Sequence, residues 1–207
     1  MVKVKICGLT TLRDALKAVE YGADALGFNF YPPSPRCMSV AETESILREL
    51  PPHVCKVGVF VNEPRQKIES VIRGCQTDAC DGLTAVQFHG DEDPNYCVGW
   101  PLKVIKALRV RDREALETLN DYLADYFLLD SYSTGFGGSG TPFSWEWLVG
   151  HMSDRMILAG GLDLGNVHRA VQELAPFAVD VCSGVETTPG VKDHVKMRDF
   201  IAAAKGH

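Results

Sequence analysis

The sequence has no excess of positive charge and no long hydrophobic run. Its 21 Lys and Arg residues are outnumbered by 27 Asp and Glu residues, which makes the formal net charge −6. A basic patch is the usual electrostatic signature of a nucleic-acid-binding protein, and a membrane-spanning helix needs roughly 20 apolar residues in a row. We therefore expect neither a nucleic-acid partner nor a membrane partner. The first ten residues, MVKVKICGLT, show no signal-peptide pattern, so we expect a cytoplasmic location.

The sequence also lacks the cysteine spacing of a disulfide scaffold or a zinc site. Its seven cysteines are an odd number, they are scattered, and none forms a CxxC pair. The closest two, Cys75 and Cys80, have no neighbouring His and no second Cys pair that could complete a zinc site. The sequence therefore predicts free thiols in a reducing compartment, most of them small buried side chains, and no bound metal.

Short apolar runs rich in β-branched residues alternate with segments of helical periodicity along the chain. We expect strands at residues 2–7, 24–30, 54–61, 84–88, 102–108, 125–130, 155–159 and 178–182. We expect helices at residues 12–21, 40–50, 64–73, 111–119, 166–174 and 193–204. Strands that are apolar on both faces and alternate with helices are typical of a parallel sheet in an α/β protein.

Eight such units favour closure of the sheet into a (β/α)8 TIM barrel. No change in composition divides the chain, so we expect residues 1–207 to form one barrel domain. The structural alternative is a doubly wound open sheet. That fold usually has fewer strands, and the Gly-x-Gly-x-x-Gly pattern that often follows its first strand is absent here.

Two glycine-containing turns follow the seventh and eighth predicted strands. Gly160 and Gly161 lie in the first turn, and Ser183 and Gly184 lie in the second. Glycines allow backbone N–H groups to approach an anion closely, and the corresponding loops of TIM barrels frequently bind phosphate. We therefore predict a phosphate site there, although the same glycines could serve only to turn the chain sharply.

A thiol and a carboxyl group end two other predicted strands, and in a barrel both would point into the same mouth. Cys7 ends the first strand and could act as a base in its thiolate form. Asp130 ends an apolar strand, and burial of an unpaired carboxyl group favours the protonated form, which can donate a proton. The pair predicts general acid–base catalysis. The alternatives are a structural thiol at Cys7 and a cap or salt bridge at Asp130.

Eight sequence blocks carry a resemblance that covers essentially the whole chain. They are KICGLT, GFNFYPPSPR, VGVFVN, QFHGDE, IKALRV, LLDSYSTGFGGSGTPFSW, ILAGGL and VDVCSGVETTPGVKD. In this order they resemble the phosphoribosylanthranilate isomerase family. The resemblance implies an enzyme of tryptophan biosynthesis that converts N-(5-phosphoribosyl)anthranilate to 1-(2-carboxyphenylamino)-1-deoxyribulose 5-phosphate by an Amadori rearrangement. Because an isomerisation needs no redox carrier, we expect no cofactor.

The resemblance also implies roles for individual residues. It makes Cys7 the general base and Asp130 the general acid, and it implies a flexible loop over the site at residues 137–140. Cys182 departs from the family, which commonly has Ser at that position. The substrate-binding residues that it implies are Arg36 for the anthranilate carboxylate, His89 and Asp180 for the sugar, and Gly160, Gly161, Ser183 and Gly184 for the phosphate.

Two other functions remain open from the sequence. The histidine-pathway phosphoribosyl isomerase performs the same rearrangement on a related substrate, but an Asp is expected there at the end of the first strand, where this chain has Cys7. A non-catalytic phosphosugar-binding barrel is the alternative from a different class. The joint presence of Cys7, Asp130 and Arg36 argues against it. The sequence leaves open whether the protein is a monomer or a homodimer.

Overall fold

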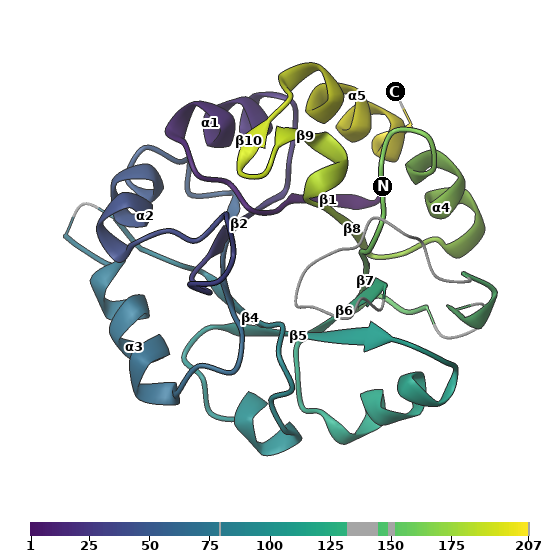
Figure 1. The fold of residues 1–207 in the computed structure, drawn as a ribbon, viewed down its shortest axis with the longest axis horizontal. Coiled ribbons are helices and arrows are strands. Elements are labelled where there is room, and N and C mark those ends of the chain that lie inside the picture. Colours follow the sequence, from purple (N-terminus) through teal and green to yellow (C-terminus); the bar gives the residue numbers. More distant parts are fainter. Residues whose placement is uncertain (79, 132–144, 149–151, 207) are drawn as a thin grey trace.

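Eight parallel strands close into a barrel in the computed structural model of the chain, which describes residues 1–78, 80–131, 145–148 and 152–206. The predicted α/β barrel is therefore confirmed (Figure 1). The last strand pairs with the first, and Lys5 lies opposite Asp180 in that pair. The strands are β1 (Lys3–Ile6), β2 (Ala25–Asn29), β3 (Cys55–Phe60), β4 (Ala85–Phe88), β5 (Lys103–Val110), β6 (Tyr126–Ser131), β7 (Met156–Leu158) and β8 (Ala178–Val181).

Helices surround the barrel in the connections after β1, β2, β3, β7 and β8 (Figure 1). They are α1 (Leu12–Glu20), α2 (Val40–Leu47), α3 (Arg65–Gly74), α4 (Val167–Leu174) and α5 (His194–Lys205). Thr11 accepts a hydrogen bond from the Asp14 backbone at the start of α1, and Ser39 forms a capping box with Glu42 at the start of α2. Such side-chain oxygens satisfy backbone N–H groups that have no partner inside the helix.

The connections after β4, β5 and β6 contain 3₁₀ helices in their described parts. These are η1 (Pro94–Cys97), η2 (Glu114–Asp121) and η3 (Trp145–Leu148). The helix expected at residues 111–119 is therefore η2, so the prediction of an α-helix there was wrong. Side chains three residues apart eclipse one another in a 3₁₀ helix. This geometry buries Leu116 and Leu119 together, with 2% and 7% of their surfaces exposed.

Alternate residues of each strand point into the barrel, and their character changes along its axis. A cluster of small and medium apolar side chains fills the interior; its members are Val57, Ala85, Ile105, Ala107, Leu128, Ile157, Ala159 and Ala178. Two residues further along β6 and β8, the same inward face carries Asp130 and Asp180. The apolar interior therefore ends in a polar mouth at the carboxyl ends of the strands.

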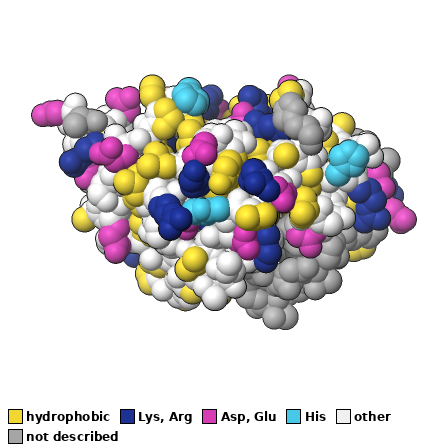
Figure 2. Space-filling view, turned by 90° about the horizontal axis from the view of Figure 1, so that it is seen from above, with side chains coloured by type: hydrophobic (Ala, Val, Ile, Leu, Met, Phe, Trp, Pro, Cys, Tyr) yellow, Lys and Arg dark blue, Asp and Glu magenta, His cyan; other side chains and the backbone are white. Residues whose placement is uncertain are grey.

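The outer surface mixes charges of both signs. Seen from above the view of Figure 1, Lys and Arg side chains are interspersed with Asp, Glu and hydrophobic side chains (Figure 2). Within the described parts of the chain, no helix has the length and apolar character needed to cross a membrane. All seven cysteines are free thiols, as predicted, and four of them are buried.

Candidate active site

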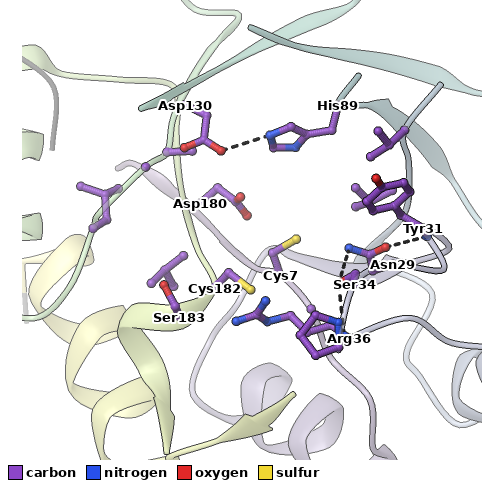
Figure 3. A pocket seen from close by; sticks show the side chains of 18 of the residues that line it. Cys7, Asn29, Tyr31, Ser34, Arg36, His89, Asp130, Asp180, Cys182 and Ser183 are labelled. Atoms are coloured by element: carbon purple, nitrogen blue, oxygen red, sulfur yellow. Dashed lines mark hydrogen bonds and ion pairs between the residues drawn. The ribbon is translucent and has the colours of Figure 1, made fainter. Parts of the chain in front are cut away.

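A cavity of about 320 Å³ opens at the carboxyl ends of the strands. It lies where the barrel topology brings together residues that are far apart in the sequence (Figure 3). Gly184 is the one predicted site residue outside the lining. The predicted residues that line it are Cys7, Arg36, His89, Asp130, Gly160, Gly161, Asp180 and Ser183.

Cys7 lies just after β1, with its backbone N–H donating to the Val181 carbonyl at 2.9 Å. A Cβ atom on Gly27 would lie 2.8 Å from the Cys7 sulfur, so only glycine leaves room for the thiol there. The neighbouring Cys182 thiol holds the pKa of Cys7 well below its usual range, against the opposing effect of burial. The ammonium groups of Lys5 and Lys192 act in the same direction. The site therefore favours the thiolate, which is the basic form.

A buried ion pair lies beneath Cys7 on the same inward face. Lys5 Nζ is 2.8 Å from Asp180 Oδ1, and the Lys5 side chain is 2% exposed. Burial opposes the charge of Lys5, but the nearby Asp180 carboxylate and Cys7 thiolate raise its pKa above the ordinary value. Burial raises the pKa of Asp180 to about 6, although Lys5 opposes that rise. Lys5 thus keeps a positive charge next to the thiolate.

Asp130 and His89 lie across the cavity from Cys7 (Figure 3). His89 Nε2 is 3.1 Å from Asp130 Oδ2, and His89 Nδ1 is 2.9 Å from the Gln87 side-chain amide nitrogen. Because that amide nitrogen donates, Nδ1 accepts, and Nε2 carries the proton that it donates to Asp130. The second carboxyl oxygen of Asp130, Oδ1, is buried and has no hydrogen-bond partner among the described residues. This oxygen therefore keeps an unfilled hydrogen-bonding capacity among the described residues.

Arg36 enters the cavity from the loop after β2 and forms a two-pronged ion pair with Glu186 of β9 (Glu186–Thr188). Its Nε and Nη2 atoms donate to the two Glu186 oxygens at 2.9 and 2.6 Å. Lys192 of β10 (Val191–Lys192) donates to the same carboxylate at 2.8 Å. Gly8 lies beneath Arg36 at a φ of 69°, and a Cβ there would be 2.5 Å from the Arg36 side chain. The guanidinium is thus held in place at the cavity wall.

The two glycine-containing turns close the remaining side of the cavity. Gly160 and Gly161 have φ values of 79° and 68°, a left-handed conformation that glycine adopts without strain. Gly184 packs against the turn after β7, where a Cβ would lie 2.1 Å from the Leu162 carbonyl oxygen. α4 begins only at Val167, so any anion held here would meet the backbone of the turns rather than the end of that helix.

Sequence reasoning missed several polar residues of the site: Asn29, Tyr31 and Ser34, which line the cavity, and Lys5, Gln87, Glu186 and Lys192, which bond to lining residues. Lys5 and Gln87 do leave a signal, because each is an inward polar residue two positions before a predicted site residue. Glu186 leaves none, since its partner Arg36 is 150 residues away in the sequence. The predicted loop at residues 137–140 lies outside the described residues. Among those described, no group of three or more His, Cys, Asp or Glu side chains is placed to hold a metal ion.

Comparisons with known proteins agree on one family. A family model for N-(5'phosphoribosyl)anthranilate (PRA) isomerase matches residues 4–203. An N-(5'-phosphoribosyl)anthranilate isomerase from Pelobacter propionicus is 49% identical, with 99% of this chain and 96% of the relative covered. The crystal structure of the Thermotoga maritima phosphoribosyl anthranilate isomerase is 45% identical, with a TM-score of 0.90 and full coverage of both chains. A crystal structure of a phosphoribosyl anthranilate isomerase in complex with reduced 1-(o-carboxyphenylamino)-1-deoxyribulose 5-phosphate is 43% identical, with a TM-score of 0.86 and full coverage of both chains.

Proposed function

The chain belongs to the N-(5'-phosphoribosyl)anthranilate isomerase family, and we propose that its Cys7 and Asp130 are the base and the acid of the isomerisation. The protein is an isomerase of tryptophan biosynthesis that converts N-(5'-phosphoribosyl)anthranilate to 1-(2-carboxyphenylamino)-1-deoxyribulose 5-phosphate. This Amadori rearrangement needs one group that delivers a proton and another that removes one. The proposal therefore assigns each proton transfer to a side chain in the cavity.

The first step opens the sugar ring. Asp130 donates the proton of its carboxyl group to the furanose oxygen, the bond between that oxygen and C1 breaks, and a Schiff base forms at C1. In the second step Cys7, as thiolate, removes the proton from C2, which gives an enolamine that tautomerises to the ketone. The observation that carries this assignment is that one cavity holds a stabilised Cys7 thiolate and, opposite it, an Asp130 oxygen without a hydrogen-bond partner among the described residues.

Other residues that line the cavity are placed to bind the phosphate and the sugar of the substrate. We propose that the turns with Gly160, Gly161, Ser183 and Gly184 bind its phosphate, since left-handed glycines let the backbone approach an anion closely. In Figure 3 Asp180 lies between Ser183 and Asp130, and His89 lies beside Asp130, away from Ser183; we propose that the sugar lies next to these side chains. His89 also donates to Asp130, so its proposed role includes holding the acid in position.

We propose that Arg36 binds the anthranilate carboxylate, because a guanidinium presents a fork of donors to a planar anion. Glu186 occupies its Nε and Nη2 edge, which leaves the Nη1 edge for the substrate. Arg36→Ala should raise KM by about 10- to 100-fold, the effect of one hydrogen bond between charged groups, with a much smaller change in kcat. Steady-state kinetics measures both.

A matched control for Arg36 is Arg48→Ala. Arg48 is also paired with a Glu, Glu44, but it lies on α2's C-terminal end with 51% of its side chain exposed, and its loss should leave KM unchanged. A large fall in kcat for Arg36→Ala at unchanged KM would contradict the assignment, because a contact to a remote carboxylate exists equally in the ground state and the transition state.

The direct test of function is to mix the protein with freshly made N-(5'-phosphoribosyl)anthranilate and follow the loss of anthranilate fluorescence. We expect turnover in the presence of a chelator and without any organic cofactor. Binding of the substrate without its consumption would instead indicate a non-catalytic phosphosugar-binding barrel. Turnover of the histidine-pathway substrate alone would indicate the other isomerase, whose expected Asp is replaced here by Cys7.

We further propose that residues 1–207 act as one domain in the cytoplasm, as a monomer or a homodimer, without a nucleic-acid or membrane partner. The net charge of −6 and the interspersed surface charges support this proposal (Figure 2).

A further inference from the structure

Cys7 and Cys182 are neighbours on two paired strands. In the parallel pair of β1 and β8, Lys5 lies opposite Asp180 and Ile6 lies opposite Val181. The Cys7 backbone N–H continues this ladder by donating to the Val181 carbonyl at 2.9 Å, which brings Cys7 beside Cys182. Because side chains alternate between the faces of a strand, both cysteines share the inward face of the Lys5–Asp180 ion pair. Figure 3 shows the two sulfur atoms next to each other at the cavity wall.

Two glycines leave room for the two sulfur atoms. A Cβ on Gly8 would lie 2.8 Å from the Cys182 sulfur, and a Cβ on Gly27 would lie 2.8 Å from the Cys7 sulfur. A side chain at either position would displace a thiol. Both places are therefore occupied by glycine, and both cysteines line the cavity.

The polar groups next to Cys182 limit which atoms its thiol can donate a hydrogen bond to. Lys192 Nζ donates to the Cys182 carbonyl at 3.1 Å and lies 3.8 Å from its sulfur. The Cys182 thiol is within hydrogen-bond reach of Glu186 Oε1, at 3.8 Å. The Glu186 carboxylate already accepts two hydrogen bonds from Arg36, one from Lys192 and one from the Gly190 backbone N–H. The Cys7 sulfur, which Lys5 also approaches, is the other acceptor beside the Cys182 thiol.

We propose that Cys182 is a positioning residue of this isomerase, whose S–H group donates to the Cys7 sulfur and thereby keeps Cys7 a thiolate aimed into the cavity. The inference rests on the proposed role of Cys7 as the base. A Ser hydroxyl at this position could donate the same hydrogen bond.

The charges around the pair agree with this direction of the hydrogen bond. The bond to Cys7 raises the pKa of Cys182 well above its usual range, while it lowers the pKa of Cys7 well below it. The proton therefore stays on Cys182. The charged and titratable groups around these two thiols come from several elements: Lys5 of β1, Asp180 of β8, Glu186 of β9, Lys192 of β10 and Arg36 of the loop after β2.

The test measures the rate at which iodoacetamide alkylates Cys7 as a function of pH, with the modified peptide followed by mass spectrometry. Only the thiolate reacts, so the midpoint of this profile reports the pKa of Cys7 without any need for turnover. Cys182→Ala removes the donor and should move the midpoint upward by about one to two pH units, the effect of losing one hydrogen bond to a charged group. Cys182→Ser keeps a donor and should stay near the wild-type midpoint.

Enzyme kinetics gives a second readout. The low-pH limb of kcat/KM should move upward in the Cys182→Ala variant and remain in place in the Cys182→Ser variant. Cys97→Ala, which alters a buried cysteine of η1, is the control and should shift neither profile. Thermal unfolding of each variant shows that it is folded.

Two results would overturn the inference: a Cys182→Ala profile that coincides with the wild type, or equal shifts in the Ala and Ser variants. Failure of the proposed function has a different signature. In that case Cys7→Ala would keep its turnover whatever the alkylation profiles show.

Discussion

Replacing Cys7 with Ala is expected to lower kcat by a factor of about 10² to 10⁴, because the reaction loses its general base. The fold should persist, since Lys5 keeps its ion pair with Asp180 at 2.8 Å, and a product-like inhibitor should still bind. Single-turnover kinetics and inhibitor titration measure these two properties separately. Alkylation of Cys7 should also abolish turnover, and bound product should protect the thiol from the reagent.

The pH dependence of the wild-type enzyme follows from the lowered pKa of Cys7. A base works when it is deprotonated, so the low-pH limb of the activity profile should belong to Cys7, with activity lost as the pH falls through that pKa. Because the Cys182 hydrogen bond and the nearby ammonium groups lower it well below the usual range of a thiol, we expect activity to persist at pH values where an ordinary cysteine would be protonated. If Cys7→Ala kept a near wild-type kcat, Cys7 would be a packing residue and the mechanism would be wrong.

Asp130→Asn should also lower kcat by a factor of about 10² to 10⁴. This loss corresponds to roughly 3–5.5 kcal/mol of activation free energy. The substitution keeps the size of the side chain and an acceptor for His89, which is 3.1 Å away, but an amide cannot deliver the proton that opens the ring. KM should change little. The residual activity should rise with pH and then level off, because only Cys7 then has to titrate.

Asp14→Asn provides the matched control for Asp130. Asp14 is also a buried Asp paired with a His, since His194 Nε2 lies 2.7 Å from its Oδ1, and it lies at the start of α1 outside the cavity lining. Its substitution should leave kcat within a few-fold of the wild type. Equal losses in the two variants would mean that disruption of a buried Asp–His pair, rather than loss of an acid, explains the Asp130 result.

The positions of the catalytic candidates could be predicted because a barrel places the carboxyl ends of all its strands at one mouth. Apolar runs marked the strands, since a sheet covered on both faces requires them. The last residue of a run, such as Cys7 or Asp130, was therefore predicted to face the mouth before any partner was known. The 3₁₀ helix η2 escaped prediction because periodicities of 3.0 and 3.6 residues are hard to separate over so short a segment.

The sequence by itself thus determined the eight strands, the barrel and the side chains at its mouth, because these follow from a local pattern of apolar and polar residues. Only the tertiary structure decided the charge state of Cys7. That state depends on Cys182, Lys192 and the Lys5–Asp180 pair, and the partners Lys5 and Asp180 are 175 residues apart in the sequence. Electrostatic and hydrogen-bond effects act over a few ångströms in space, so the pKa of a side chain is a property of its folded neighbours and has no signature in the order of the residues.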